Sequence, residues 1–316
     1  ECSDKNKNFT GTIYASDKSY ADDGRLKSNN GENLLIDFFS KKNALVASIP
    51  IILPGDGPMK PPERQVKPEG KYYALIIANS NYNNKEIWSD LKSPIRDANA
   101  IKKILDNKYK FENVWVIPDA TKDKIFDEVE KLKSIITDKD YLLIYYAGHG
   151  KEVGNKAYWV GVNGDNKYWK WVNVNELTNT LEKINARHIL FMIDSCYSGL
   201  SFQNKGIKSN DVDTSQNAIK DSLKNYSRKV LTSGHNEKVL DTYFNKKHSL
   251  FARGFLKILE NNDSNITAES MYFEIKRFHQ LDEDIEQVPK YGTIANLTLT
   301  IKDMAKGDFV FHVPND

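Results

Sequence analysis

The chain has 316 residues, of which 40% are hydrophobic, 11% aromatic and 28% charged, as is typical of a globular protein with a sizeable core. Its formal net charge is only +2 at pH 7, which argues against nucleic acid as a partner. No apolar stretch approaches the ~20 residues of a membrane span. The chain has two cysteines, Cys2 and Cys196, which are too few for a disulfide scaffold.

Residues 1–70 differ in composition from the rest of the chain. They are rich in Asn, Lys, Asp and Ser, with short apolar patches at residues 34–39 and 44–53. Residues 54–58 read Pro-Gly-Asp-Gly-Pro, and further prolines follow at positions 61, 62 and 68. This is loop chemistry, because proline fixes φ and glycine frees it. The sequence therefore predicts an N-terminal extension that ends in a linker.

After Gly70 the pattern predicts alternating strands and helices. Apolar runs of strand length predict strands at residues 72–79, 114–117, 141–147, 158–162, 188–193 and 229–232. Helical spacing predicts helices at 95–105, 121–136, 249–259 and 268–278, with a short one near 218–223. Thr121 is the predicted N-cap of the second. A further helix is predicted to begin after Asn173 or Asn175 as N-cap and to end at residue 184. Strands that are apolar on both faces, separated by amphipathic helices, predict an α/β fold with a mainly parallel sheet covered on both sides.

Two of the predicted strands end abruptly in small and polar residues. The first runs into Gly148-His149-Gly150, and the second into Asp194-Ser195-Cys196. The carboxyl ends of parallel strands form the edge where ligands bind, so the imidazole and the thiol would share a groove if the strands are neighbours. A thiol with a pKa near ~8.5 needs a base to become a nucleophile, and imidazole supplies one. The amides of Gly150 and Cys196 are candidate donors to an oxyanion.

These two segments resemble the caspase and metacaspase superfamily of cysteine peptidases. Cys196 follows His149 by 47 residues, close to the ~50 typical of caspases. Further similarities, including some to bacterial members, lie at residues 72–79, 91–98, 231–234, 249–252, 287–289 and 307–311. The resemblance covers about residues 71–313. It implies a three-layer sandwich forming a peptidase domain at 71–316, with residues 1–70 outside it, and a Cys196–His149 dyad.

The sequence departs from true caspases around the cysteine. It reads Asp-Ser-Cys-Tyr-Ser-Gly, where caspases have Gln-Ala-Cys followed by a glycine two residues later. Metacaspases line the pocket for the residue before the scissile bond with two aspartates, and by resemblance these are Asp97 and Asp194. Two carboxylates favour an Arg or Lys side chain, so we expect cleavage after basic residues. The alternatives are that Asp194 caps a following helix and that Asp97 is an ordinary acidic residue in a first helical turn.

The polar segment at residues 201–227 follows the predicted nucleophile, where caspases carry a cleavable linker. It contains Lys205, Lys208, Lys220 and Lys224, at which an enzyme specific for basic residues would process itself as a zymogen. The alternative is an uncut surface loop. For residues 1–70, which lie outside the resemblance, we expect either a propeptide or arm that occludes the groove, or an accessory or tethering element.

No cofactor is expected for dyad chemistry, and the histidines and cysteines lack the spacing of a zinc site. Residues 263–265 with Glu269 resemble a calcium loop only faintly, but some metacaspases require calcium, so calcium is a possible activator. The resemblance favours a monomer acting on protein or peptide substrates. Two other functions stay open: a catalytically silent interaction protein on the same fold, and another Cys-His acyl transfer such as transpeptidation.

Overall fold

The computed structural model describes residues 66–195, 213, 215–234, 247–280, 287–294 and 307–314, together with strands at 27–29, 33–39, 45–52 and 202–203. The chain divides into two compact units, residues 1–63 and 64–316. Among the described residues, no helix combines the length and the apolar character that crossing a bilayer requires.

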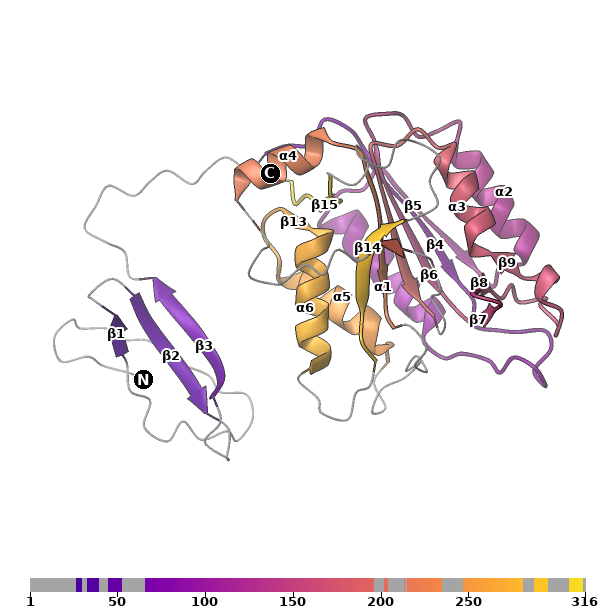
Figure 1. Cartoon of the computed structure of the whole chain (residues 1–316), viewed down its shortest axis with the longest axis horizontal. Helices are drawn as coiled ribbons and strands as arrows, with labels where there is room; N and C mark the ends of the chain where they lie inside the picture. Colours follow the sequence, from indigo (N-terminus) through magenta and orange to yellow (C-terminus); the bar gives the residue numbers. More distant parts are fainter. Residues whose placement is uncertain are drawn as a thin grey trace. The chain divides into compact units, whose positions relative to one another are not determined.

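The first unit contains a three-stranded antiparallel sheet in the order β1-β2-β3 (Figure 1). Its strands are β1 (Lys27–Asn29), β2 (Asn33–Phe39) and β3 (Leu45–Ile52). The two apolar patches seen in the sequence of this region are therefore strands that pair with each other.

The second unit is built on a seven-stranded sheet in the order β11-β14-β12-β10-β6-β4-β5. Its five strands from β12 to β5 are parallel, and β14 is antiparallel to both β12 and β11. The strands are β4 (Tyr72–Ala78), β5 (Asn113–Pro118), β6 (Tyr141–Ala147), β10 (His188–Asp194), β11 (Phe202–Gln203), β12 (Ser227–Thr232) and β14 (Lys290–Ile294). Two small antiparallel sheets accompany it, one of β7 (Gly150–Val153), β8 (Lys156–Trp159) and β9 (Val172–Asn173), the other of β13 (Ile266–Thr267) and β15 (Val310–Phe311).

Six helices cover both faces of the central sheet in the described part of the chain. They are α1 (Pro94–Asn107), α2 (Lys122–Leu132), α3 (Val174–Glu182), α4 (Gln216–Lys224), α5 (Leu250–Asn261) and α6 (Ala268–Gln280). Helices α1, α4, α5 and α6 contribute to the core on one face, and α2 and α3 to the core on the other. In Figure 1, α2 and α3 lie on one side of the strands, and α5 and α6 on the other. The predicted three-layer, mainly parallel α/β fold is therefore confirmed.

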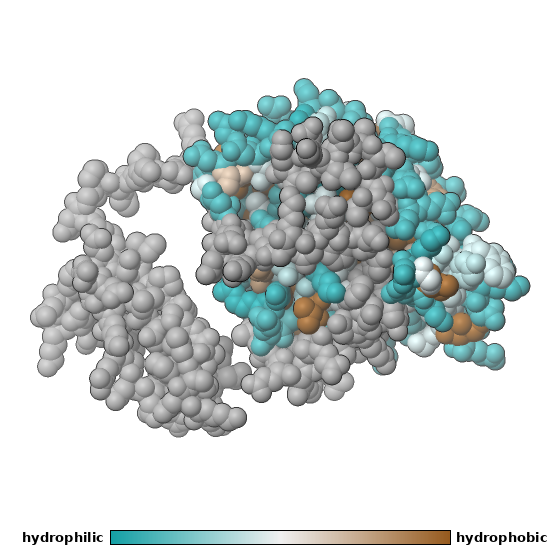
Figure 2. Space-filling model, viewed as in Figure 1, coloured by the Kyte–Doolittle hydropathy of each residue, from teal (hydrophilic) through white to brown (hydrophobic). Residues whose placement is uncertain are grey.

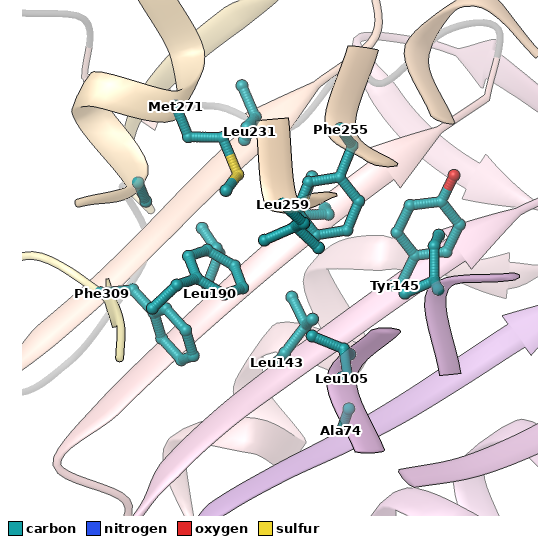
Figure 3. Packing of buried hydrophobic residues seen from close by; sticks show 14 of the residues in the cluster. Ala74, Leu105, Leu143, Tyr145, Leu190, Leu231, Phe255, Leu259, Met271 and Phe309 are labelled. Atoms are coloured by element: carbon teal, nitrogen blue, oxygen red, sulfur yellow. The ribbon is translucent and has the colours of Figure 1, made fainter. Parts of the chain in front are cut away.

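The two cores follow from strands that are apolar on both faces. Along β4, Tyr72, Ala74 and Ile76 belong to one core, and the intervening residues to the other, because successive side chains of a strand point to opposite faces. Figure 3 shows part of the first core, in which helix side chains meet those of the strands: Leu105, Phe255, Leu259, Met271, Leu143, Leu190 and Leu231. On the face seen in Figure 2, the coloured surface is mainly hydrophilic, with isolated hydrophobic residues.

Element boundaries differ from the sequence prediction at a few points. Thr121 caps α2 as predicted, since its hydroxyl accepts a hydrogen bond from the N–H of Lys124 at 3.3 Å. The helix ends at Leu132 and not at residue 136, because turns follow in which the Leu132 carbonyl accepts hydrogen bonds from the next residues. Asn173, and not Asn175, caps α3. The predicted strand at 158–162 begins earlier and ends at Trp159.

Candidate active site

The pairing of β6 with β10 determines how the two candidate catalytic segments meet. These strands are adjacent and parallel, and their register pairs Ala147 with Asp194. His149 follows Ala147 by two residues, and Cys196 follows Asp194 by two. The strand adjacency that the sequence analysis required is therefore present. Cys196 itself, with its amide, lies outside the described residues.

His149 is half-buried and is held by its backbone and its ring. Its N–H donates to the Tyr82 hydroxyl at 2.7 Å, and its ring lies 4.7 Å from that of Tyr82 and 5.3 Å from that of Trp88, centroid to centroid. The preceding Gly148 permits this approach, because a Cβ at that position would lie 2.7 Å from the Tyr146 hydroxyl. These contacts fix the direction of the imidazole.

The Ser89 carbonyl defines which ring nitrogen carries the proton. Nε2 of His149 lies 2.8 Å from the Ser89 carbonyl oxygen. A carbonyl only accepts hydrogen bonds, so Nε2 is the donor and the lone pair of the neutral ring is on Nδ1. Sequence reasoning found no third member beside the dyad. No sequence signal marks Ser89, because its backbone makes the contact and any residue there has the same carbonyl.

Asp97 and Asp194 come from different elements and are both buried. Asp97 lies in the first turn of α1 and is fully buried, and Asp194 is the last residue of β10 and is 4% exposed. His248 Nδ1 lies 2.5 Å from Asp97 Oδ1, and the N–H of Ser249 donates to Asp97 Oδ2 at 3.2 Å. Asp97 is therefore engaged in tertiary contacts, which a plain first-turn acid would not need.

Asp194 is only partly satisfied by its neighbours. Its Oδ2 accepts hydrogen bonds from the Ser249 hydroxyl at 2.5 Å and from the Tyr145 hydroxyl at 3.3 Å. Its Oδ1 is buried and has no hydrogen-bond partner within the described residues. A buried carboxylate oxygen without a donor is costly, so this atom is one that a bound cation or hydrogen-bond donor would satisfy.

The electrostatics of the pair favour a cationic ligand. The pKa of Asp194 is raised to about 7, first by burial and then by the nearby Asp97 carboxylate, against the opposite effect of the Ser249, Tyr145 and Ser233 hydroxyls. The same surroundings, burial first, hold the pKa of the Tyr145 hydroxyl well above its usual value. Near neutral pH, a positive group between the carboxylates would therefore relieve both desolvation and like-charge repulsion.

The remaining predicted residues have simpler surroundings. Gly150 is buried and begins β7, directly after His149, where it pairs with Trp159 of β8. Lys220 and Lys224 lie on α4. Lys205 and Lys208 lie outside the described residues.

The residues that faintly resembled a calcium loop are engaged otherwise. Asp263 pairs with Lys108 at 3.0 Å. Asn265 donates to the Val66 carbonyl at 2.9 Å, and its Oδ1 lies 2.7 Å from His312 Nδ1. No group of three His, Cys, Asp or Glu suited to a metal ion occurs in the described ranges. Asp263 and Asn265 therefore already have protein partners, and calcium as an activator stays a prediction.

Comparison with known proteins agrees with this geometry. No curated protein matches the chain. The family model of the caspase domain matches residues 71–293, a stretch that runs from β4 to β14 and includes His149, Asp97, Asp194 and Cys196. Because the match spans well over half of the chain and the sheet, the helices and the strand-end segments fit it, the protein belongs to the caspase-domain family of cysteine peptidases.

Proposed function

We propose that this protein is an endopeptidase that hydrolyses peptide bonds after Lys or Arg through a Cys196–His149 dyad. The observation that carries the specificity is the pair of buried carboxylates, Asp97 and Asp194, at the carboxyl edge of the sheet. A guanidinium or ammonium group would donate a charge-assisted hydrogen bond to Oδ1 of Asp194, which has no partner among the described residues. An aspartate side chain would be repelled from the same pocket.

The chemistry proceeds through an acyl-enzyme. The Cys196 thiol gives its proton to His149 Nδ1, and the sulfur attacks the scissile carbonyl carbon. The amides of Gly150 and Cys196 hold the oxyanion of the tetrahedral intermediate. His149 then protonates the leaving amine as the C–N bond breaks. Water, deprotonated by His149, cleaves the thioester and regenerates the thiol.

The hydrogen bond to the Ser89 carbonyl supports this role of His149. It stabilises the imidazolium that forms when Nδ1 takes the thiol proton, because the donor Nε2–H becomes more acidic and the carbonyl dipole faces the charge. It also keeps Nδ1 as the basic nitrogen throughout the cycle. A backbone carbonyl here does part of what a carboxylate does in a catalytic triad.

Self-processing, if the protein is a zymogen, is best supported at Lys205 and Lys208. Lys220 and Lys224 belong to α4, which is capped by Ser215 and buries Ile219 and Leu223. A peptide bond within a packed helix is a poor substrate, since proteolysis requires the local chain to open. We therefore propose that cleavage, where it occurs, lies before α4.

The test is cleavage of matched fluorogenic peptides ending in Arg, Lys or Asp, with wild type, Cys196→Ala and the matched control Cys2→Ala. We expect activity after Arg and Lys, little after Asp, and loss only in Cys196→Ala. Mass spectrometry of the products with an added amine separates hydrolysis from transpeptidation. Neither labelling of Cys196 by a lysyl chloromethylketone nor turnover in the full chain, with both present in a form starting at residue 64, would point to an occluded zymogen. Neither labelling nor turnover, in the full chain or in a form starting at residue 64, would contradict the proposal.

A further inference from the structure

Ser249 contacts both carboxylates of the proposed specificity pocket. Its N–H donates to Asp97 Oδ2 at 3.2 Å, and its hydroxyl donates to Asp194 Oδ2 at 2.5 Å. The same hydroxyl oxygen accepts the N–H of Ala252 at 3.0 Å and so caps α5. The residue is 1% exposed, and its hydroxyl is the donor whenever Asp194 is ionised, because a carboxylate only accepts hydrogen bonds.

We propose that Ser249 is a positioning residue that holds Asp97 and Asp194 together as one cation-binding unit. This inference rests on the proposed function, because it concerns the binding of the same basic side chain. Two buried carboxylates repel each other, and without a shared donor they would move apart or one would take up a proton. Ser249 holds both at once from the rigid start of a helix.

The surroundings of Asp194 indicate what the hydroxyl contributes. The groups that face this carboxyl are Asp97 from α1, Tyr145 from β6, Ser233 after β12 and Ser249 before α5. Of the hydrogen bonds that lower the pKa of Asp194, that from Ser249 is the largest. Removal of the hydroxyl would therefore raise the pKa of Asp194 above about 7 and leave it protonated at neutral pH.

The experiment compares Ser249→Ala and Ser249→Gly with Ser215→Ala. Ser215 caps α4 through the same contact, to the N–H of Ala218 at 3.2 Å, but touches no carboxylate of the pocket. Glycine keeps most of the capping preference, so Ser249→Gly separates the hydroxyl from helix stability. For an Arg peptide we expect KM to rise about tenfold in both Ser249 variants, with kcat nearly unchanged. In wild type, KM should fall as Asp194 loses its proton with rising pH, and in the variants this fall should occur at higher pH. Ser215→Ala should leave both unchanged.

The outcomes separate the two proposals. If wild type cleaves after Arg and folded Ser249→Gly has the wild-type KM and pH profile, Ser249 is not a positioning residue. If wild type does not cleave after Arg at all, the proposed function itself fails. Ser249→Thr, which keeps a hydroxyl and a capping side chain, should restore the KM of wild type.

A separate observation concerns a basic cavity at the opposite edge of the sheet, where β6 and β10 begin. The cavity has a volume of about 370 Å³. Its charged lining consists of one carboxylate, Glu69, and five cations: Lys67, Lys139, Arg187, Lys220 and Lys224. Cavities of this size hold small ligands in other proteins, and five cations around one carboxylate repel each other unless an anion joins them.

Arg187 is fixed in this cavity without being neutralised. Its Nε donates to the Asp138 carbonyl at 3.0 Å and its Nη1 to the Lys224 carbonyl at 3.1 Å. Its guanidinium lies over the Tyr226 ring, with Cζ 4.8 Å from the centroid. Both hydrogen bonds go to carbonyls and not to a carboxylate, so the positive charge stays available to an anion.

The lysines of the cavity also differ from many elsewhere on the surface. Lys71 pairs with Glu112 and Lys85 with Asp90. Of the cavity lysines, Lys224 lies 3.8 Å from Asp221, whereas no ion pair within 4 Å joins Lys67, Lys139 or Lys220 to a described carboxylate. Apolar Val66 and Leu223 also line the cavity. We infer that it binds a small, multiply charged phosphate compound, with the apolar residues facing any organic part.

Such a ligand would bridge two segments of the chain. The N–H of Val66 donates to Gln216 Oε1 of α4 at 3.1 Å, so the segment that enters the domain already contacts the helix that carries Lys220. An anion between Lys67, Lys220 and Arg187 would add ionic contacts to that hydrogen bond. We therefore expect binding to stabilise the folded chain.

The test is thermal unfolding of the full chain with inorganic tripolyphosphate or adenosine triphosphate, against sodium sulfate at equal ionic strength. We expect a saturable rise in Tm of about 4 °C or more. The rise should be lost in Lys139→Glu/Lys220→Glu and kept in the matched charge change Lys103→Glu/Lys156→Glu, which lies outside the cavity. A greater rise with the nucleotide supports an organic ligand, and an equal rise supports an inorganic one. A rise that does not saturate, or that is the same in both double variants, would overturn the inference.

Discussion

The two edges of the central sheet carry similar residue types in different environments. At the amino edge, Asp140 is 5% exposed, and its oxygens accept hydrogen bonds from the N–H of Lys71 at 2.9 Å and from the N–H and hydroxyl of Thr137 at 2.8 Å. At the carboxyl edge, Asp194 accepts two hydrogen bonds on Oδ2, and no group in the described ranges donates to its Oδ1. Asp140 joins segments of the fold, whereas Asp194 has one oxygen without a partner in the part of the chain that the structure describes.

The histidines of the two edges differ in burial. His188 begins β10, is fully buried, and has its Nε2 2.8 Å from the Asn225 carbonyl oxygen. Burial lowers its pKa to about 3, so it is neutral throughout the physiological range. His149 is half-buried at the carboxyl edge, and its ring contacts Trp88. The comparison teaches that a missing hydrogen bond must be weighed with its place in the fold, since His188 Nδ1 also lacks a partner among the described residues although it lies in the core.

The largest expected effect separates the two histidines. His149→Ala should lower kcat for an Arg peptide about 10³-fold, because a general acid–base group contributes about 10²–10⁴, while the free energy of unfolding changes little. His188→Ala should destabilise the fold and leave kcat of the folded fraction near that of wild type. Steady-state kinetics and thermal unfolding of both variants check this. Equal loss of kcat in the two would break the comparison.

The next effect separates the two aspartates by activity. Asp194→Asn should lower kcat/KM for Arg and Lys peptides about 100-fold, since it removes a buried negative charge from the pocket. Asp140→Asn should leave kcat/KM almost unchanged. Titration with a series of Arg, Lys and Gln peptides measures the difference. If Asp140→Asn loses basic specificity as well, the carboxyl edge is not the site of recognition.

The variants Asp140→Asn and Asp194→Asn should change the stability of the fold in opposite directions. Asp140→Asn is expected to lower the free energy of unfolding by about 1–3 kcal/mol. The new amide N–H groups would face the hydrogen-bond donors that now donate to the carboxylate. Asp194 has a folded pKa of about 7, above its unfolded value, so its favourable contribution is present at low pH and is lost as pH rises through about 7. Asp194→Asn should therefore stabilise the fold by about 1–2 kcal/mol at pH 8 and by less at pH 5. Urea unfolding at both pH values tests this sign.

The pH dependence of substrate binding follows from the same carboxyl. KM for an Arg peptide should fall as pH rises through about 7, as Asp194 loses its proton and attracts the cation. In Asp194→Asn this change should disappear. A peptide with an uncharged residue before the scissile bond is the control, and its KM should not follow the same curve.

The smallest expected effect concerns the support of His149. Tyr82→Phe removes the hydroxyl that accepts the N–H of His149 at 2.7 Å, so a backbone donor near the site loses its partner. We expect kcat to fall only about threefold to tenfold and stability to fall by about 1–2 kcal/mol. Tyr158→Phe, on β8, is a matched control. A loss as large as that of His149→Ala would mean that Tyr82 takes part in the chemistry.

The sequence predicted the parts of the fold that local pattern encodes. The uninterrupted apolar runs of β4, β6 and β10 predicted a parallel sheet, and Thr121 predicted the start of α2. The sequence did not predict β14, because Lys290–Ile294 is short, begins with lysine and contains a glycine. Its pairing with β12 depends on tertiary contact and not on local propensity.

The candidate site, too, was predicted from the sequence only in part. His149, Asp97 and Asp194 were named from strand ends and resemblance, and the structure describes where each one lies. The contacts of His248 and Ser249 with Asp97 join residues more than 150 positions apart, and no periodicity or spacing rule indicates such pairs. In the sequence, Ser249 was noted only as part of residues 249–252, which resemble the caspase and metacaspase superfamily. The proposed role of Cys196 is a matter for the experiments above.

The Ser89 carbonyl has a consequence for how this protein tolerates mutation. Because the imidazole is oriented by a peptide oxygen, the information lies in the path of the loop and not in the identity of residue 89. That path is fixed nearby, where the N–H of Tyr82 donates to Asp90 and the N–H of Leu91 to the Ser80 carbonyl. A scan that exchanges one side chain at a time would find position 89 silent and its neighbours sensitive. Only a change of the backbone itself, such as an insertion between residues 80 and 91, would expose the contribution of this oxygen.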